Sequence, residues 1–341
     1  MFTLDHNETT EFLDNVAVRM NMPAMVWGQP GVGKSDAVRQ LAAKHDAVLV
    51  DVRLSQYDSV DLRGIPVPAD GLTVWHMPST MPFVGNPRFP TDRPVFLFLD
   101  EINAAAPSVA AVAYQLILDR ACGEHELMPN VRIIAAGNRE GDKGVTNKMP
   151  LPLANRFCHV ELGVSTDALI EHMLGQVPGE CVAFLSWRKP LVSTFDPAKP
   201  AKAFATPRSW MQAFRVYEDA AMPRAVKRAA MSGLVGEGPA VEFFAFVDQL
   251  DKVIPIERIL RNPDTAPIPE ELSMQYATVV SVSGHMTTEN VADLHTYIAR
   301  YAPEFAVLCW QLAVKRDDAL LGTKAFMEMA RRYKDLFSVT S

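Results

Sequence analysis

The stretch Gly28-Gln-Pro-Gly-Val-Gly-Lys-Ser35 decides the fold, because it has the pattern G-x-x-x-x-G-K-[ST]. A short apolar run at 24–27 precedes it, and residues 36–44 have the pattern of a helix. Between a strand and a helix, a glycine-rich loop of this kind wraps a phosphate chain with its backbone N–H groups. Glycine allows the tight turn and the close approach of the backbone to the phosphates. The sequence therefore predicts a nucleoside triphosphate site at this loop.

Side-chain chemistry indicates roles within the loop. The ammonium group of Lys34 would lie on the β- and γ-phosphates, and the hydroxyl group of Ser35 would bind Mg²⁺. The residues predicted to bind the nucleotide are Gly28, Gln29, Pro30, Gly31, Val32, Gly33, Lys34, Ser35 and Asp36.

Polar residues follow two later apolar runs. Asp100 and Glu101 end the run that begins at Val95, and Asn138 follows the run 131–137. An aspartate at the end of such a strand helps to hold Mg²⁺. The adjacent glutamate suits a general base that orients or deprotonates the attacking water. We therefore predict Ser35 and Asp100 as metal ligands, and the catalytic residues as Lys34, Glu101 and Asn138.

Apolar runs alternate with helical patterns in the first half of the chain. Continuous apolar strands between helices are typical of a parallel sheet that helices cover on both faces, which is an α/β fold. We expect strands at 24–27, 47–54, 95–100, 131–137 and 157–162, and helices at 9–21, 35–44 and 107–121. After about residue 165 only helical patterns remain, at 167–175, 181–188, 208–221, 224–235 and 239–253, then a linker at 255–270 and two or three more helices over 271–338.

Composition narrows the function further. The chain has 341 residues and a formal net charge of −7, which argues against a general binder of polyanions. Four cysteines without a C-x-x-C pair are typical of buried free thiols in a reducing compartment. The N-terminus has no basic region followed by an apolar stretch, and no run of 18 apolar residues occurs. We expect a soluble, cytoplasmic protein without a membrane span.

In this order, the motifs resemble those of an AAA+ ATPase: the phosphate loop as Walker A, the run Phe96 to Glu101 as Walker B, and Asn138 as sensor 1. The resemblance is closest to the MoxR family, in the branch of the activators named for CbbQ, NorQ and GvpN. The segments that support it are 100–108, 135–139, 153–157 and 206–210.

The resemblance implies ATP and Mg²⁺ as cofactors and hydrolysis of ATP as the activity. Arg156 would be the arginine finger, which reaches the γ-phosphate in a neighbouring subunit, and Arg139 is a rival for that role. Arg208 would be sensor 2, at the start of a lid helix. The stretch that follows Asn103 lacks an arginine that is common in the family, which leaves one contact between subunits in doubt.

The resemblance also implies an assembly and partners. The family forms hexameric rings and remodels or activates protein clients, often through a separate adaptor with a von Willebrand A domain. The implied domains are an AAA+ core at 1–163, a helical lid at 164–254, and a C-terminal helical extension at 255–341 to which we give no role.

A proline-rich stretch at about 64–94 falls where the family carries its helix-2 insert, and residues 122–130 match the hairpin before sensor 1. Both would face the centre or top of the ring. We expect an exposed surface for protein contacts in the insert, with the alternative that the same side chains pack within the insert's own hairpin. Those side chains are Trp75, Met77, Met81 and Phe83.

Three other classes of protein share part of this pattern. A nucleic-acid motor of the helix-2-insert group shares the insert, but 122–130 carries two glutamates and no lysine or arginine, and 331–334 is a lone basic cluster. A signalling GTPase would carry N-K-x-D, whereas residues 147–150 read Asn-Lys-Met-Pro. A small-molecule kinase would need neither Arg156 nor a ring.

Overall fold

The computed structural model describes residues 1–139, 141–142, 148–199 and 201–334, and the chain divides into two compact units. The first unit comprises Met1–Ser165 and Phe195–Pro200, and the second comprises Thr166–Thr194 and Ala201–Ser341. The expected boundaries of core, lid and extension stay predictions.

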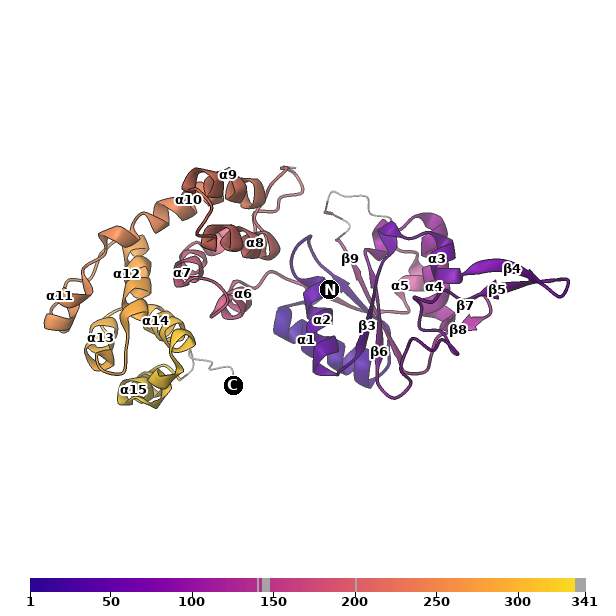
Figure 1. The fold of residues 1–341 in the computed structure, drawn as a ribbon, viewed down its shortest axis with the longest axis horizontal. Helices are drawn as coiled ribbons and strands as arrows, with labels where there is room; N and C mark the ends of the chain where they lie inside the picture. The colour runs from indigo at the N-terminus through magenta and orange to yellow at the C-terminus, as the bar shows by residue number, and fades with distance from the viewer. Residues whose placement is uncertain (140, 143–147, 200, 335–341) are drawn as a thin grey trace. The chain divides into compact units, whose positions relative to one another are not determined.

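A six-stranded parallel sheet forms the centre of the first unit (Figure 1). All five expected strands are present, which confirms the predicted α/β fold. A sixth strand, β1, was not predicted, because two residues at a sheet edge leave no periodic pattern. The order is β1 (Thr3–Leu4), β10 (Cys158–Leu162), β2 (Ala24–Trp27), β9 (Val131–Gly137), β6 (Val95–Asp100) and β3 (Val48–Arg53).

Alternate residues of β6, the strand next to the edge strand β3, fill two separate cores. Leu97 and Leu99 pack with α4 (Pro107–Asp119) on one face of the sheet. Phe96 and Phe98 pack on the other face, with α1 (His6–Leu13) and α2 (Lys34–Lys44). Burial on both faces explains why the strand is apolar throughout.

The predicted helix at 9–21 differs in the structure. The α-helix α1 begins at His6, where Asp5 and Glu8 form a capping box, and a π-helical segment, Asp14–Arg19, continues it. The polar first turn of α1 hides this start from an analysis of apolar periodicity, because capping depends on polar side chains.

The insert contains an antiparallel hairpin of β4 (Ile65–Ala69) and β5 (Leu72–His76). Asp70 and Gly71 form its turn, both with positive φ, as a two-residue turn of this kind requires. The prediction of an exposed surface is wrong for Met81 and Phe83, which are fully buried in the core that contains α4.

Phe83 is buried because the chain after β5 returns to the body of the unit. Phe83 forms an isolated bridge with Leu127. Leu127 directly follows a second hairpin, which consists of β7 (Ala121–Cys122) and β8 (His125–Glu126). This second hairpin is the one expected within 122–130. The short helices α3 (Ser59–Arg63) and α5 (Leu151–Ala154) complete the unit.

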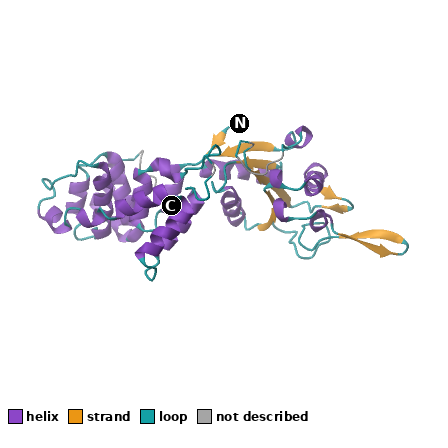
Figure 2. Cartoon of the chain, turned by 90° about the horizontal axis from the view of Figure 1, so that it is seen from above, coloured by secondary structure: helices purple, strands orange, loops and turns teal. Residues whose placement is uncertain are grey.

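Helices make up the second unit in the described part of the chain (Figure 2). The expected linker at 255–270 contains α11, and four helices rather than two or three follow it, because short polar turns separate them. They are α6 (Thr166–Met173), α7 (Gly179–Trp187), α8 (Pro207–Glu218), α9 (Arg224–Val235), α10 (Glu237–Val247), α11 (Ile256–Arg261), α12 (Leu272–His285), α13 (Val291–Ile298), α14 (Pro303–Arg316) and α15 (Lys324–Arg332). Within the described ranges, no helix has the length and apolar character needed to cross a membrane.

Candidate nucleotide site

The phosphate loop joins β2 to α2 and has the backbone that its glycines permit. Gly31 and Gly33 have φ of 76° and 107°. Gly28 is confined: a Cβ there would lie 2.8 Å from the backbone oxygen of Leu162. The N–H of Gly28 donates to the backbone oxygen of Gly137 at 3.3 Å, so the loop begins beside the end of β9.

Lys34 connects the loop to Asn138. Its ammonium group donates to the backbone oxygens of Gly28 at 2.6 Å and Gln29 at 3.1 Å, and to Oδ1 of Asn138 at 3.0 Å. Two predicted catalytic side chains are therefore in direct contact, although 104 residues separate them in the chain.

Ser35 and Asp100 form the second contact of the site. The Ser35 hydroxyl donates to Oδ2 of Asp100 at 3.0 Å, and the backbone N–H of Glu101 donates to Oδ1 at 2.8 Å. Burial raises the pKa of the Asp100 carboxyl group, against the opposing effect of the Ser35 bond. Removal from water is therefore the main influence on the pKa of this carboxyl group. A cation beside it would offset the free-energy cost of burying its negative charge.

These two oxygens fit Mg²⁺. A hydroxyl and one carboxylate, together with phosphate oxygens and waters, are a ligand set that Mg²⁺ commonly takes. In the ranges that the structure describes, no group of three or more His, Cys, Asp or Glu side chains could hold a metal by itself. A metal at Ser35 and Asp100 would accordingly depend on the phosphates of the nucleotide.

Glu101 has an unusual backbone. Its φ of 55° is in the left-handed region, which a non-glycine residue adopts at a cost. Its partly buried carboxylate accepts a hydrogen bond from the Ser55 hydroxyl, in the segment after β3. With this backbone conformation, the Glu101 side chain leaves the chain in a different direction from those of the preceding strand residues. The contact with Ser55 was not predicted from the sequence.

Asn103 is a further residue that the sequence analysis did not select. Its buried amide donates to the backbone oxygen of Asn138 at 2.8 Å and accepts from the N–H of Asn138 at 3.3 Å. Gly137 leaves room for it, because a Cβ at Gly137 would lie 2.8 Å from Oδ1 of Asn103. Asn103 thus fixes the backbone of Asn138.

The predicted arginines are in different surroundings. Arg139 pairs with Glu161 of β10 at 2.7 Å within the same chain. Arg156, after α5, is exposed, and no ion pair of its side chain occurs among the described residues. Arg208 is exposed in the first turn of α8, in the second unit. The roles of these arginines stay predictions.

The remaining loop residues also stay predictions as nucleotide contacts. Gln29 and Val32 are buried, and Val32 packs in the core beside α2. Asp36 is exposed and pairs with Arg39 at 2.7 Å. Asn147, in the stretch compared with GTPases, lies outside the described residues.

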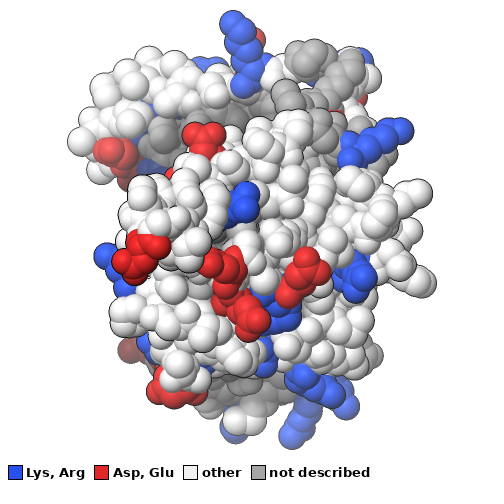
Figure 3. All heavy atoms as spheres, turned by 90° about the vertical axis from the view of Figure 1, so that its right-hand side faces the viewer, with Lys and Arg blue, Asp and Glu red and all other residues white. Residues whose placement is uncertain are grey.

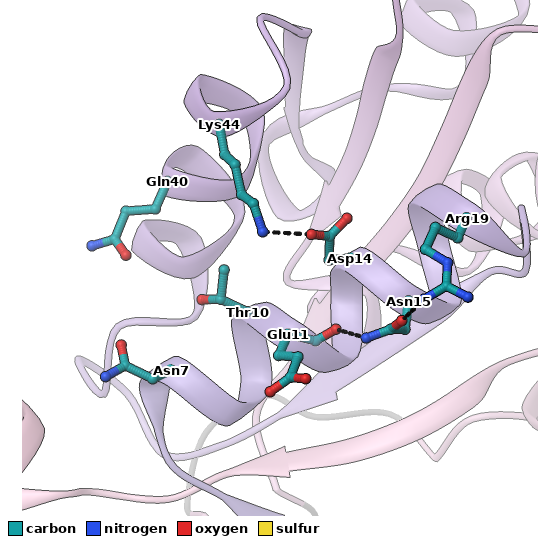
Figure 4. A pocket seen from close by; sticks show the side chains of 8 residues that line it. All are labelled: Asn7, Thr10, Glu11, Asp14, Asn15, Arg19, Gln40 and Lys44. Atoms are coloured by element: carbon teal, nitrogen blue, oxygen red, sulfur yellow. Dashed lines mark hydrogen bonds and ion pairs between the residues drawn. The ribbon is translucent and has the colours of Figure 1, made fainter.

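A shallow depression of about 470 Å³ lies on the outer face of α1 and α2 (Figure 4). It shares no residue with the predicted site. Its lining is polar and charged: Asn7, Thr10, Glu11, Asp14, Asn15, Arg19, Gln40 and Lys44.

The sheet order, the phosphate loop and the polar strand ends together define an α/β fold of the AAA+ type. Residues 23–157 match the model of the AAA domain family, dynein-related subfamily. The chain is also similar to solved structures. NtrX from Brucella abortus, in complex with ADP, is 14% identical over 97% of this chain and 68% of that chain, with a TM-score of 0.41. A RuvB mutant from Thermotoga maritima is 14% identical over 86% and 87%, with a TM-score of 0.39. At these values, neither likeness bears on what this chain binds or does.

Proposed function

We propose that this protein hydrolyses ATP with Mg²⁺ as a ring-forming AAA+ ATPase of the MoxR type, and that the ring remodels a protein client through a separate von Willebrand A domain adaptor. The observation that carries the proposal is the pair of contacts Lys34–Asn138 and Ser35–Asp100. They bring the phosphate loop and the ends of β6 and β9 to one place, where a triphosphate would need them.

The chain's own residues would then act as follows. The loop N–H groups and Lys34 hold the phosphates, and Ser35 and Asp100 hold Mg²⁺, which offsets the charge of the β- and γ-phosphates. Glu101 orients the attacking water and takes up its proton at a carboxylate oxygen. Asn138, whose backbone Asn103 holds, would contact the γ-phosphate or its attacking water. Arg156 is exposed, as a finger that acts on a neighbouring subunit must be.

Exposed apolar side chains in and beside the β4–β5 hairpin are consistent with the proposal that the client is a protein. Ile65 is 62% exposed and Leu72 is 72% exposed, and Met77 also reaches solvent. Exposed apolar side chains along and beside a hairpin favour contact with protein rather than with a polyanion. Figure 3 shows one face of the molecule, on which Lys and Arg are interspersed with acidic and uncharged residues instead of forming a basic stripe. No observation favours the nucleic-acid motor.

Glu101→Gln tests the proposal. We expect this variant to bind ATP with a Kd close to that of the unchanged protein, because the phosphate contacts remain, while turnover falls about a hundredfold or more with loss of the base. Calorimetric titration with ATP and a phosphate-release assay measure the two quantities. Glu126→Gln, on the β7–β8 hairpin, is the matched control and should hydrolyse ATP normally.

Near-normal turnover by Glu101→Gln would remove Glu101 as the base. The same variant, held in ATP, serves to capture partners from extract of the native host. Recovery of a protein with a von Willebrand A domain supports the remodelling function, and nuclease-sensitive complexes would assign the protein to the nucleic-acid motors.

A further inference from the structure

A tryptophan and a histidine outside the predicted site connect the phosphate loop to the segment that carries Arg156. Trp27 is the last residue of β2, directly before Gly28. Its indole Nε1 donates to Nδ1 of His159 in β10 at 3.0 Å, and the two rings are stacked with centroids 6.1 Å apart. The other ring nitrogen of His159, Nε2, lies 2.7 Å from the backbone oxygen of Ala154, the last residue of α5.

The two hydrogen-bond partners determine which ring nitrogen of His159 carries the hydrogen. An indole N–H can only donate, so Nδ1 must accept; a backbone oxygen can only accept, so Nε2 must carry the hydrogen. The imidazole is therefore neutral, with one tautomer, and both of its nitrogens are used. A side chain held at both ends in this way transmits a displacement of one partner to the other.

Both ends of this connection lie next to residues of the predicted site. On one side, the Trp27 ring lies against the end of β9: a Cβ at Gly137 would be 3.1 Å from Cζ3 of Trp27. On the other side, Ala154 is two residues before Arg156, whose backbone N–H donates to the oxygen of Leu153 in α5. The ring of Phe157 also contacts His159, with centroids 6.0 Å apart.

We propose that His159 is a positioning residue that couples the nucleotide site of one subunit to the Arg156 that the same subunit presents to its neighbour. This proposal rests on the proposed ring and on Arg156 as a finger in trans. A movement of Gly28 or Asn138 displaces Trp27, Trp27 turns the imidazole, and the imidazole moves the end of α5. The state of one site thereby sets the position of the arginine at the next.

The first test removes the connection at each end. His159→Phe keeps a ring and loses both bonds, and Trp27→Phe loses only the indole donor. We expect each to change the Kd for a non-hydrolysable ATP analogue less than about twofold, and to lower kcat about tenfold. The double variant should be no slower than the slower single variant, because both changes break one connection. Losses that multiply in the double variant would overturn the proposal.

Conservative variants separate positioning from packing. His159→Gln keeps an amide N–H that can reach Ala154, and His159→Asn keeps an oxygen that can accept from Trp27; each should recover part of kcat. The matched control is His295→Phe in the second unit, because Trp310 Nε1 donates to His295 Nδ1 at 3.2 Å in the same manner. It should lower the Tm without lowering kcat. Equal kcat for the Phe, Gln and Asn variants of His159 would contradict a positioning role.

Mixed rings locate the effect. Glu101→Gln subunits would bind ATP, hydrolyse it poorly and still present Arg156 to a neighbour. Unchanged subunits mixed with Glu101→Gln/His159→Phe subunits should turn over ATP more slowly than the same mixture with Glu101→Gln alone. Equal rates would mean that His159 acts only within its own subunit, against the proposal.

The assembly itself has a separate control. If Arg156→Ala and Lys34→Ala subunits restore no turnover when mixed, the finger in trans fails and the coupling fails with it. If they do restore turnover while the His159 mixtures are equal, only the coupling is overturned.

Discussion

At the scale of single residues, the site divides into side chains that carry their own signal and side chains that do not. Lys34, Ser35, Asp100 and Glu101 belong to short motifs beside apolar strands, so spacing alone predicts them. Asn103, Ser55 and His159 act through contacts with distant backbone or side chains, which only the folded chain brings together. A lone asparagine or histidine has no pattern that could have revealed them.

Asn103 gives a prediction at this scale. In Asn103→Ala, the backbone of Asn138 loses two hydrogen bonds, and its side chain is no longer fixed beside Lys34. We expect kcat for ATP to fall about tenfold, as loss of about 1.4 kcal/mol of transition-state stabilisation would give, with a small change in nucleotide Kd. Steady-state kinetics and calorimetric titration measure both.

The control for this change is Asn130→Ala. Its amide donates to the backbone oxygens of Pro90 and Arg93 at the opposite end of β9, so its loss costs comparable stability at a distance from the site. If the Asn130 and Asn103 variants lose kcat equally, stability rather than position explains the effect.

At the scale of elements, sequence predicted best what periodicity specifies. The five predicted strands and the flanking helices of the sheet follow from apolar runs and from 3.6-residue patterns. The insert shows the limit, because the residues between β5 and β6 have no period, and the burial of Phe83 depends on a bridge to Leu127. The short strand β1 and the π-helical turn were missed for the same reason.

The junction of α1 and α2 gives a pH-dependent prediction. Asp14 accepts from Lys44 at 2.6 Å and pairs with His45 at 2.8 Å. The Lys44 bond, with the His45 contact, holds the pKa of the Asp14 carboxyl below its usual value of 3.8. Its folded-state pKa is depressed, so the carboxylate stabilises the fold above about pH 4 and that contribution is lost as the pH falls through the folded pKa.

Asp14→Asn should therefore lower the free energy of unfolding at pH 7 by about 0.5–1 kcal/mol, since much of Lys44 is exposed to screening by solvent. The difference from the unchanged protein should narrow below pH 4. Urea unfolding between pH 3 and pH 7 measures it. As a control, Asp46→Asn removes the more exposed pair with Arg93 and should lower the free energy of unfolding by less. If the difference in this free energy between Asp14→Asn and the unchanged protein were the same at every pH, the role given to Asp14 would be wrong.

At the scale of the whole molecule, the question is whether one chain or two neighbouring chains supply the residues of one nucleotide site. Lys34 meets Asn138 and Ser35 meets Asp100 within one chain, whereas the described part of the chain offers Arg156 no ion-pair partner. Because an arginine finger acts on a neighbour, the resemblance to the MoxR family could name Arg156 as the candidate, and the single chain could not supply its partner.

Mixing of subunits tests this assembly. Arg156→Ala alone should bind ATP and lose about a thousandfold in turnover, as loss of an arginine finger does elsewhere. Addition of Lys34→Ala subunits should restore part of the activity, because those subunits present an intact Arg156 to neighbours with an intact phosphate loop. Arg139→Ala is the contrast: its partner Glu161 is in the same chain, so the same mixing should not restore it. Absence of recovery for Arg156→Ala at every ratio would place that arginine outside the neighbour's site.

The two prolines of β4 have a consequence for crowded conditions. A hairpin with exposed apolar side chains and two open edges is a template on which other extended chains can assemble. Pro66 and Pro68 alternate with the residues that pair with β5 through their N–H groups, so the outer edge of β4 lacks donors at both positions. The hairpin can therefore offer a foreign chain its side chains, while its β4 edge gives other copies of the chain few backbone donors to pair with. If the hairpin contacts a protein client, as proposed, these prolines would limit self-association of the hairpin along the β4 edge.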